Sequence, residues 1–213
     1  PASYRRQRQM CIRDSSRGTQ KTMLILEAAG FDVILIETVG VGQSEVTVSE
    51  MVDFFLLLLL PGSGDSLQGI KKGVLELADL IAVNKADGEN ELRAKQSARD
   101  YQSAMALLSN AGSHWATPVL TCSALTGQGV SNIWDHISDH HTHAQETGAW
   151  SKRRSQQQIR WMWSMVEDQL IHNLRNEASI AQTVSETEEQ VLNGDLSATE
   201  AAKAILALFK ESS

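Results

Sequence analysis

Asn84, Lys85 and Asp87 directly follow a short apolar run, Leu80–Val83, and their side chains suit recognition of a guanine base. A carboxylate such as that of Asp87 only accepts hydrogen bonds, and guanine offers two adjacent donors, N1–H and N2–H₂, that adenine lacks. Hydrogen bonds to a charged group contribute about 1.5–3 kcal/mol each, so two of them would select guanine strongly. The Lys85 stem can lie along the purine, and the Asn84 amide can join neighbouring loops. The alternative is a chance match in a polar turn.

A second loop carries residues suited to a magnesium–phosphate site. The β-branched, apolar run 31–36 predicts a buried parallel strand. Glu37 follows it and can hold Mg²⁺ directly or through water. Gly40 allows its backbone N–H to approach a γ-phosphate closely. Gln43 can orient a water molecule or can be an ordinary surface residue.

A third loop follows the strand expected at 118–121 and contains Ser123, Ala124 and Leu125. A backbone N–H near Ala124 can donate to the guanine O6. All three loops should emerge at the carboxyl ends of parallel strands, which is where open α/β sheets bind ligands. The sequence therefore predicts one site assembled from three loops.

The order of the expected elements predicts an α/β fold with a doubly wound parallel sheet of the P-loop NTPase type and a C-terminal helical arm. The apolar run 54–60 is too short to cross a bilayer and predicts a strand buried on both faces. Further strands are expected at 31–36, 80–83 and 118–121, with helices at 19–29, 46–51, 67–76, 89–110 and 130–143.

Beyond about residue 145 the pattern becomes helical, with helices expected at 150–183, 185–192 and 201–210. Ser197 and Glu200 resemble a capping box that opens the last of them. An apolar stripe on the first helix must pack either on the sheet domain or on a partner subunit. Its members recur at three- and four-residue steps: Ile159, Trp163, Val166, Leu170 and Leu174.

Composition limits the classes of partner. The 213 residues are 42% hydrophobic and carry a formal net charge of −7, which argues against general nucleic-acid binding. Two cysteines provide no disulfide framework. No membrane span or signal peptide is expected. His136 and His140 lie one helical turn apart and can hold a transition metal, or they can simply favour the end of a helix.

Three segments together resemble the MeaB/ArgK family, namely 37–45, 60–73 and 84–87. This family consists of P-loop GTPases, formerly named LAO/AO transport ATPases, that act as chaperones of the adenosylcobalamin-dependent methylmalonyl-CoA mutase. The resemblance extends from about Arg17 to the C-terminus. It implies GTP/GDP and Mg²⁺ as cofactors, the mutase as partner, a homodimer and a cytoplasmic location. It also implies a switch in the glycine-rich loop after residue 60, whose polar contacts would come from Asp65, Gln68, Lys71 and Lys72; a flexible connection is the alternative.

The sequence contains no Gly-x-x-x-x-Gly-Lys-Ser/Thr motif, which would hold the α- and β-phosphates. We therefore expect a C-terminal portion of a longer GTPase that does not hydrolyse GTP by itself. Residues 1–15 do not resemble the family, 16–144 are expected to belong to the GTPase domain, and 145–213 to form a dimerisation arm. The alternatives to a regulatory GTPase are a non-catalytic module that dimerises or binds the mutase, and a metal-loading GTPase.

Overall fold

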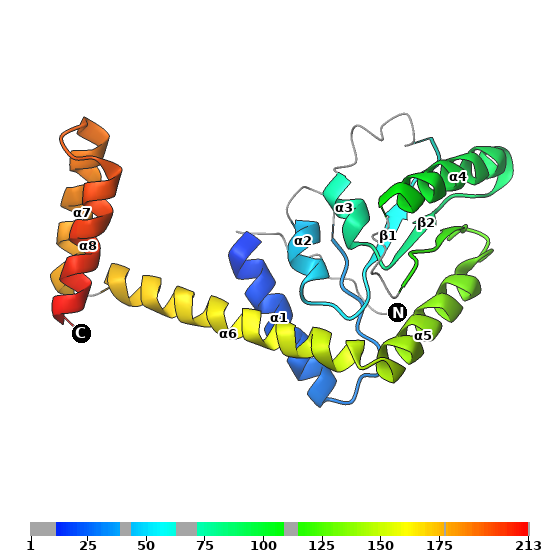
Figure 1. Ribbon diagram of the computed structural model, residues 1–213, viewed down its shortest axis with the longest axis horizontal. Coiled ribbons are helices and arrows are strands. Elements are labelled where there is room, and N and C mark those ends of the chain that lie inside the picture. Colours follow the sequence, from blue (N-terminus) through cyan, green and yellow to red (C-terminus); the bar gives the residue numbers. More distant parts are fainter. Residues whose placement is uncertain (1–11, 39–43, 63–71, 109–114, 177, 213) are drawn as a thin grey trace. The chain divides into compact units, whose positions relative to one another are not determined.

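The first part of the chain is built around a parallel sheet, in which the described residues form three strands in the order β1-β2-β3 (Figure 1). The computed structural model describes residues 12–38, 44–62, 72–108, 115–176 and 178–212. The strands are β1 (Leu56–Leu59), β2 (Leu80–Val83) and β3 (Val119–Thr121). Leu57 pairs with Ile81, and Ile81 pairs with Val119, so the strands run in register. All four residues of β2 are fully buried, which agrees with their continuous apolar character.

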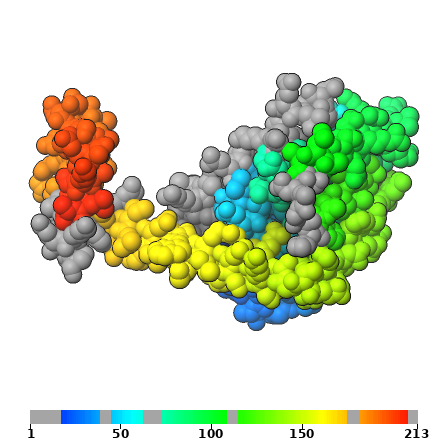
Figure 2. All heavy atoms as spheres, in the orientation of Figure 1, coloured from blue at the N-terminus to red at the C-terminus, as the bar shows by residue number. Residues whose placement is uncertain are grey.

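Helices cover both faces of the sheet, which confirms the predicted α/β class. On one face Ile81 and Val83 pack with Ala94 and Tyr101 of α4 (Glu91–Leu108). On the other face Leu80 and Ala82 pack with Ile133 of α5 (Val130–Glu146). The alternation of the β2 side chains between the two cores follows from the two-residue period of a strand. The two helices form much of the visible surface of this part of the molecule (Figure 2).

The strand predicted at 31–36 is wrong, because residues 31–38 have no regular secondary structure. Leu35 in this segment is 89% exposed. A parallel strand needs a neighbour that completes its backbone hydrogen bonds, and within the described residues the outer edge of β1 has no partner strand. The apolar sequence identified a segment with strand character, but the segment pairs with no described strand and therefore lacks the hydrogen bonds that define one.

The strand predicted at 54–60 forms over a shorter range, and its burial on both faces is wrong. Leu59 is buried, whereas Leu58 is 58% exposed on the face that α5 covers. Leu60, just after the strand, is also exposed. The reason is that β1 is the outer strand of the described sheet, and α5 packs mainly over β2 and β3 through Ile133.

The remaining helices of this region are close to those expected. Helix α1 (Ile12–Ala28) begins before the predicted start at residue 19, and α2 (Ser44–Ser49) and α3 (Lys72–Leu77) are short. A 3₁₀ turn, η2 (Gly88–Asn90), precedes α4. The described part of the predicted helix 67–76 is α3, and the preceding glycine-rich segment lies outside the described residues.

The chain divides into two compact units, 1–154 and 155–213. The second unit contains most of α6 (Ala149–Asn176), together with α7 (Ala178–Asn193) and α8 (Ala198–Ser212). The predicted capping box is present: the Ser197 hydroxyl donates to the Glu200 carboxylate, with an Oγ–Oε2 distance of 2.7 Å, and accepts from the Glu200 N–H at 3.3 Å. The Ser197 hydroxyl and the Ser197 N–H, which donates to Glu200 Oε2 at 3.3 Å, lower the pKa of Glu200. None of the helices in the described ranges is long and apolar enough to cross a membrane.

Candidate functional site

The loops that follow β2 and β3 are joined by the side chain of Asn84. Its Oδ1 accepts hydrogen bonds from the Lys85 N–H at 2.7 Å and from the Ala124 N–H at 3.0 Å. The Cys122 thiol lies 3.7 Å from the same oxygen and is a weaker third donor. Asn84 therefore holds the two loops together, which is the role that its position at the end of an apolar run predicted.

Asp87 and Ser123 form the second link between these loops. The Ser123 hydroxyl donates to Asp87 Oδ2 in a short hydrogen bond and accepts from the Thr126 N–H at 3.1 Å. Ser123 is fully buried, so its hydroxyl has a fixed position. A carboxylate has about four acceptor positions on its two oxygens. Asp87 therefore retains the capacity to accept both donors of a guanine edge while Ser123 orients it.

Two backbone conformations shape the loops. Lys85 has a φ of 60°, the left-handed region that non-glycine residues seldom occupy, and the hydrogen bond from its own N–H to Asn84 stabilises this turn. Gly129 has a φ of 77°, and a Cβ at this position would lie 2.5 Å from the Thr121 carbonyl oxygen. Only glycine allows α5 to begin so close to the end of β3.

The Ala124 N–H, which the sequence assigns to the guanine O6, donates to Asn84 in this structure. A base bound here must share that donor with Asn84 or displace it. Ala124 and Leu125 are both exposed, and Leu125 is 86% exposed, so a ligand can reach this loop. The O6 contact stays a prediction.

The structure describes only some of the residues that are expected to bind Mg²⁺ and phosphate or to form the switch loop. Glu37 is exposed in the irregular segment 31–38, and it makes no hydrogen bond or ion pair with another described residue. Lys72 begins α3, but its side chain lies outside the description. Gly40, Asp65, Gln68 and Lys71 lie outside the described residues altogether. The structure therefore brings together the base-binding candidates, and the assignments to Mg²⁺ and the switch stay predictions.

The two histidines proposed as metal ligands occupy different surroundings. His136 Nδ1 lies 2.8 Å from the Asn132 carbonyl oxygen of its own helix. His140 is buried between the rings of Phe54 and Trp115. In the described part of the chain no three histidine, cysteine or acidic residues are placed to hold a metal ion. The metal-loading alternative therefore has no support here.

Cys122 contributes to this network, although its sequence context predicted no role in the site. It is 5% exposed, and burial raises the pKa of its thiol, so the group is protonated and can donate to Asn84. Its backbone also participates, because the Cys122 carbonyl accepts the Ala86 N–H at 2.9 Å. The sequence could have indicated this role, because Cys122 stands between a predicted strand and Ser123, where the backbone of the neighbouring loop must be close.

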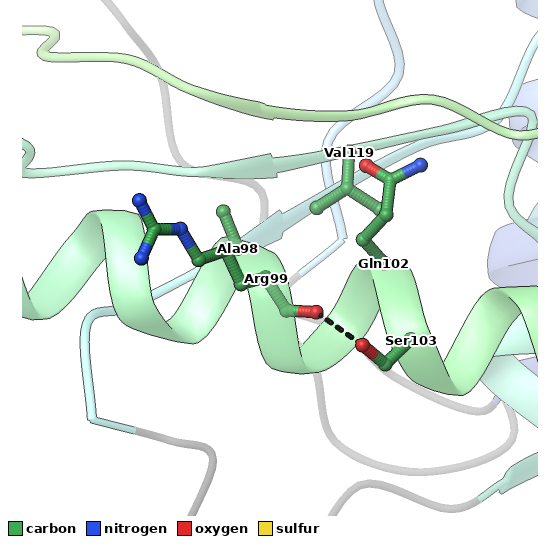
Figure 3. A pocket seen from close by; sticks show the side chains of 5 residues that line it. All are labelled: Ala98, Arg99, Gln102, Ser103 and Val119. Carbon is green, nitrogen blue, oxygen red and sulfur yellow. Dashed lines mark hydrogen bonds between the residues drawn. The ribbon is translucent and has the colours of Figure 1, made fainter.

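A shallow pocket of about 320 Å³ lies on α4 and β3, away from these loops (Figure 3). Within it the Ser103 hydroxyl donates to the Arg99 carbonyl oxygen of its own helix at 3.0 Å. The lining includes no member of the Asn84 and Asp87 network; it consists of Ala98, Arg99, Gln102, Ser103 and Val119. We assign no ligand to this pocket.

Comparison with known proteins decides the family. Residues 12–179 match the family model described as "Methylmalonyl Co-A mutase-associated GTPase MeaB". The chain belongs to this family. It is 50% identical over 194 residues to a "Putative GTPase" of Caulobacter vibrioides, a match that covers 91% of the chain. It is 38% identical over 195 residues to the "Methylmalonic aciduria type A homolog, mitochondrial" of Mus musculus, with 92% of the chain covered.

A solved structure supports the same assignment for the fold. The crystal structure of an LAO/AO transport system kinase matches 92% of the chain with a TM-score of 0.73 and 36% sequence identity. The chain spans 59% of the Caulobacter protein, 47% of the mouse protein and 63% of the chain in the solved structure. The predicted family and the P-loop type of α/β fold are thus confirmed, and the chain is part of a GTPase family whose members extend further than it does.

Proposed function

We propose that this chain is the guanine-binding part of a GTPase that controls the loading of adenosylcobalamin into methylmalonyl-CoA mutase and protects that enzyme in the cytoplasm. Asp87 accepts the N1–H and N2–H₂ of guanine, Asn84 and Ser123 hold the loops in place, and the Lys85 stem lies along the base. The observation that carries the proposal is the Ser123 to Asp87 hydrogen bond. It orients a carboxylate at the carboxyl end of a buried strand and leaves further acceptor capacity.

The family and the names of relatives support the wider part of this proposal. The matching family model names a mutase-associated GTPase, and the mouse relative is named for methylmalonic aciduria. In the complete GTPase we assign Glu37 to Mg²⁺ and Gly40 to sensing the γ-phosphate. Asp65, Gln68, Lys71 and Lys72 would pass the loss of that phosphate to the mutase through an ordering change of their loop.

The base assignment can be tested on the 213-residue chain itself with nucleoside monophosphates, which need no triphosphate-binding loop. We expect GMP, but not AMP, to shift the backbone NMR signals of Lys85 and Ala124. Asp87→Asn should weaken GMP binding by about tenfold or more, because it removes charged hydrogen bonds. The same variant should gain affinity for XMP, since the new amide can donate to the xanthine O2.

Asp100→Asn is the matched control, because it makes the same chemical change on α4, where the half-buried Asp100 accepts a hydrogen bond from Gln96 of its own helix. It should leave GMP binding unchanged. Equal shifts by GMP and AMP, or an Asp87→Asn variant that binds GMP normally, would contradict the guanine site. Mg²⁺-dependent GTP hydrolysis by the chain alone would contradict the expectation that it lacks the phosphate-holding half.

A second function, as a dimerisation or mutase-binding module, is favoured by the surface of α6. Ile159 and Trp163 are each 55% exposed, and Val166 and Leu170 continue the same stripe. We propose that residues 145–213 form a homodimer arm through it. Light scattering should then show a dimer that Trp163→Glu converts to a monomer and that Ser164→Glu, the same charge off the stripe, does not. A monomeric wild-type chain would contradict the arm.

A further inference from the structure

The amino end of β2 carries a polar cluster that the proposed nucleotide chemistry does not use. Asp79, just before β2, accepts the Phe55 N–H on its Oδ2 at 2.8 Å. The same carboxylate receives the Arg153 guanidinium, with N–O distances of 3.2–3.3 Å to both oxygens. Its backbone carbonyl accepts the Trp115 indole N–H at 2.9 Å. Asp79 thus joins the start of a buried strand to the first turn of α6.

A second arginine, one residue further along α6, joins two more segments. Arg154 Nε donates to Asp53 Oδ1 at 2.9 Å, and its Nη2 donates to Glu27 Oε1 of α1 at 2.8 Å. The guanidinium also lies 4.8 Å from the centre of the Trp150 ring, within range of a cation–π interaction. The Trp150 ring also contacts the His141 ring edge to face, with 4.5 Å between their centres. The hydrogen bond to Asp53 and, with it, the charges of Asp53 and Glu27 and the hydrogen bond to Glu27 raise the pKa of Arg154, while partial burial opposes them.

The junction between α5 and α6 is a two-residue turn. Only Thr147 and Gly148 separate the two helices, and Gly148 has a φ of 71°. Of the first six residues of α6, three are exposed (Ala149, Ser151 and Lys152), so the contacts to the sheet unit come from Trp150, Arg153 and Arg154. Two of these three contacts are ionic rather than apolar.

We propose that Arg153 and Arg154 form a releasable clamp that docks the first turns of α6 on the amino-terminal edge of the sheet, with the Thr147–Gly148 turn as the hinge. The arginine and carboxylate side chains are between 18% and 42% exposed. Water and ions therefore reach them, and each such ion pair contributes about 1 kcal/mol or less. That energy is sufficient to hold the turn closed and small enough to be overcome by a competing partner.

The clamp matters because α6 continues without interruption to Asn176. Opening it frees the start of the whole helix. Asp79 also stands next to the fully buried β2, and Asn84 follows the other end of that strand. The docked state of α6 is therefore tied to the same rigid strand that carries the base-binding loop.

The test uses the full 213-residue chain and two local measurements on the hinge. The first is amide hydrogen exchange of the peptide that spans residues 145–153. The second is the rate of cleavage after Glu146 by a glutamate-specific protease, a site that none of the variants alters. Arg153→Ala/Arg154→Ala should increase both rates by about tenfold, as expected from the loss of two partly exposed ion pairs. Arg160→Ala, an exposed arginine on the same helix, should change neither.

Exchange of the β2 amides distinguishes local release from general destabilisation. In both proteins the amides of the hinge should exchange faster than those of β2, because the hinge opens without unfolding of the sheet. Asp53→Asn, which keeps both arginines and removes one acceptor charge, should give an intermediate increase at the hinge. Hinge exchange in the double variant within twofold of wild type, or hinge amides that exchange no faster than those of β2, would overturn the proposal.

Salt provides an independent test without mutation. Raising KCl from about 0.1 M to about 1 M shortens the Debye length from about 10 Å to about 3 Å. Exchange at the hinge should then rise in the wild type and stay constant in the double variant. Equal responses of the two proteins would show that the arginines do not hold the turn and would overturn the clamp.

Discussion

The two ends of β2 both carry an aspartate, and they use it differently. At the amino end, Asp79 is satisfied within the protein by the Phe55 N–H and by both guanidinium nitrogens of Arg153. At the carboxyl end, the Asp87 carboxylate accepts a hydrogen bond from the Ser123 hydroxyl, its side-chain partner among the described residues. A carboxylate that is already paired stabilises the fold, whereas one that is oriented but not saturated can bind a ligand. The same residue type thus has a structural role at one end and a binding role at the other.

The largest expected effect concerns the geometry that brings the carboxyl end together. Gly129→Ala should lower the free energy of unfolding by about 3 kcal/mol or more, because its Cβ would lie 2.5 Å from the Thr121 backbone oxygen in a left-handed conformation. Gly127→Ala is the control, since its φ is similar, at 79°, but no atom lies within 4 Å of the added carbon. Gly127→Ala should lower the free energy of unfolding by only about 1 kcal/mol.

Urea unfolding of both variants followed by circular dichroism measures this difference. Equal destabilisation of the two would show that backbone strain, and not the close approach of α5 to β3, decides the cost. In that case the close approach of α5 to β3 would not be what holds the loops at the carboxyl end of β2 in one arrangement.

The next effect tests the structural role of the amino end. Asp79→Ala should lower the free energy of unfolding by about 2–3 kcal/mol, because it leaves the Phe55 N–H and Arg153 without their acceptor. GMP affinity should be unchanged, since the site lies at the opposite end of the strand. Asp135→Ala, an exposed position on α5, should alter neither quantity. A loss of GMP binding in well-folded Asp79→Ala would contradict the division of roles.

A smaller effect tests the binding role of the carboxyl end. Ser123→Ala should reduce GMP affinity by about threefold to tenfold, because Asp87 loses the hydrogen bond that orients it. The free energy of unfolding should fall by only about 1 kcal/mol. Ser103→Ala removes a hydroxyl that bonds to its own helix and serves as the control for both measurements. Unchanged GMP affinity in Ser123→Ala, measured by NMR titration, would show that Asp87 needs no orientation.

The sequence predicts the carboxyl end of β2 well because its signals are local. A continuous apolar run ends directly at Asn84, so the strand, its direction and the place of the loop follow from a few adjacent residues. The segment 31–36 is also largely apolar but forms no strand, because an apolar run becomes a strand only when it pairs with a neighbouring strand. Burial of β1 was overestimated for the same reason.

The amino end could not be predicted, because its contacts join residues far apart in the chain. Asp79 and Arg153 are separated by 74 positions, and Asp53 and Arg154 by 101. Nothing in the local sequence distinguishes Arg153, which pairs with Asp79, from the exposed Arg160. The hydrogen bond from Ser123 to Asp87, across 36 positions, was likewise not predicted as a contact, although both residues were identified as candidates.

The smallest effect is a pH dependence that belongs to the amino end alone. Burial lowers the pKa of His140. The neighbouring charges of Arg153, His143 and His141 lower it further, whereas the charge of Asp79 raises it. The folded state therefore favours the neutral ring, while the unfolded chain takes up a proton below its ordinary pKa of about 6.5. Stability should be fully present above that value, decline as the pH falls towards the lowered pKa, and level off below it. His140→Gln should reduce this decline in urea unfolding midpoints, and His136→Gln should preserve it. If His140→Gln leaves the decline in stability unchanged, other groups cause it. GMP affinity should stay constant over the same pH range, since His140 contacts Asp79 and not the loops at the other end of β2.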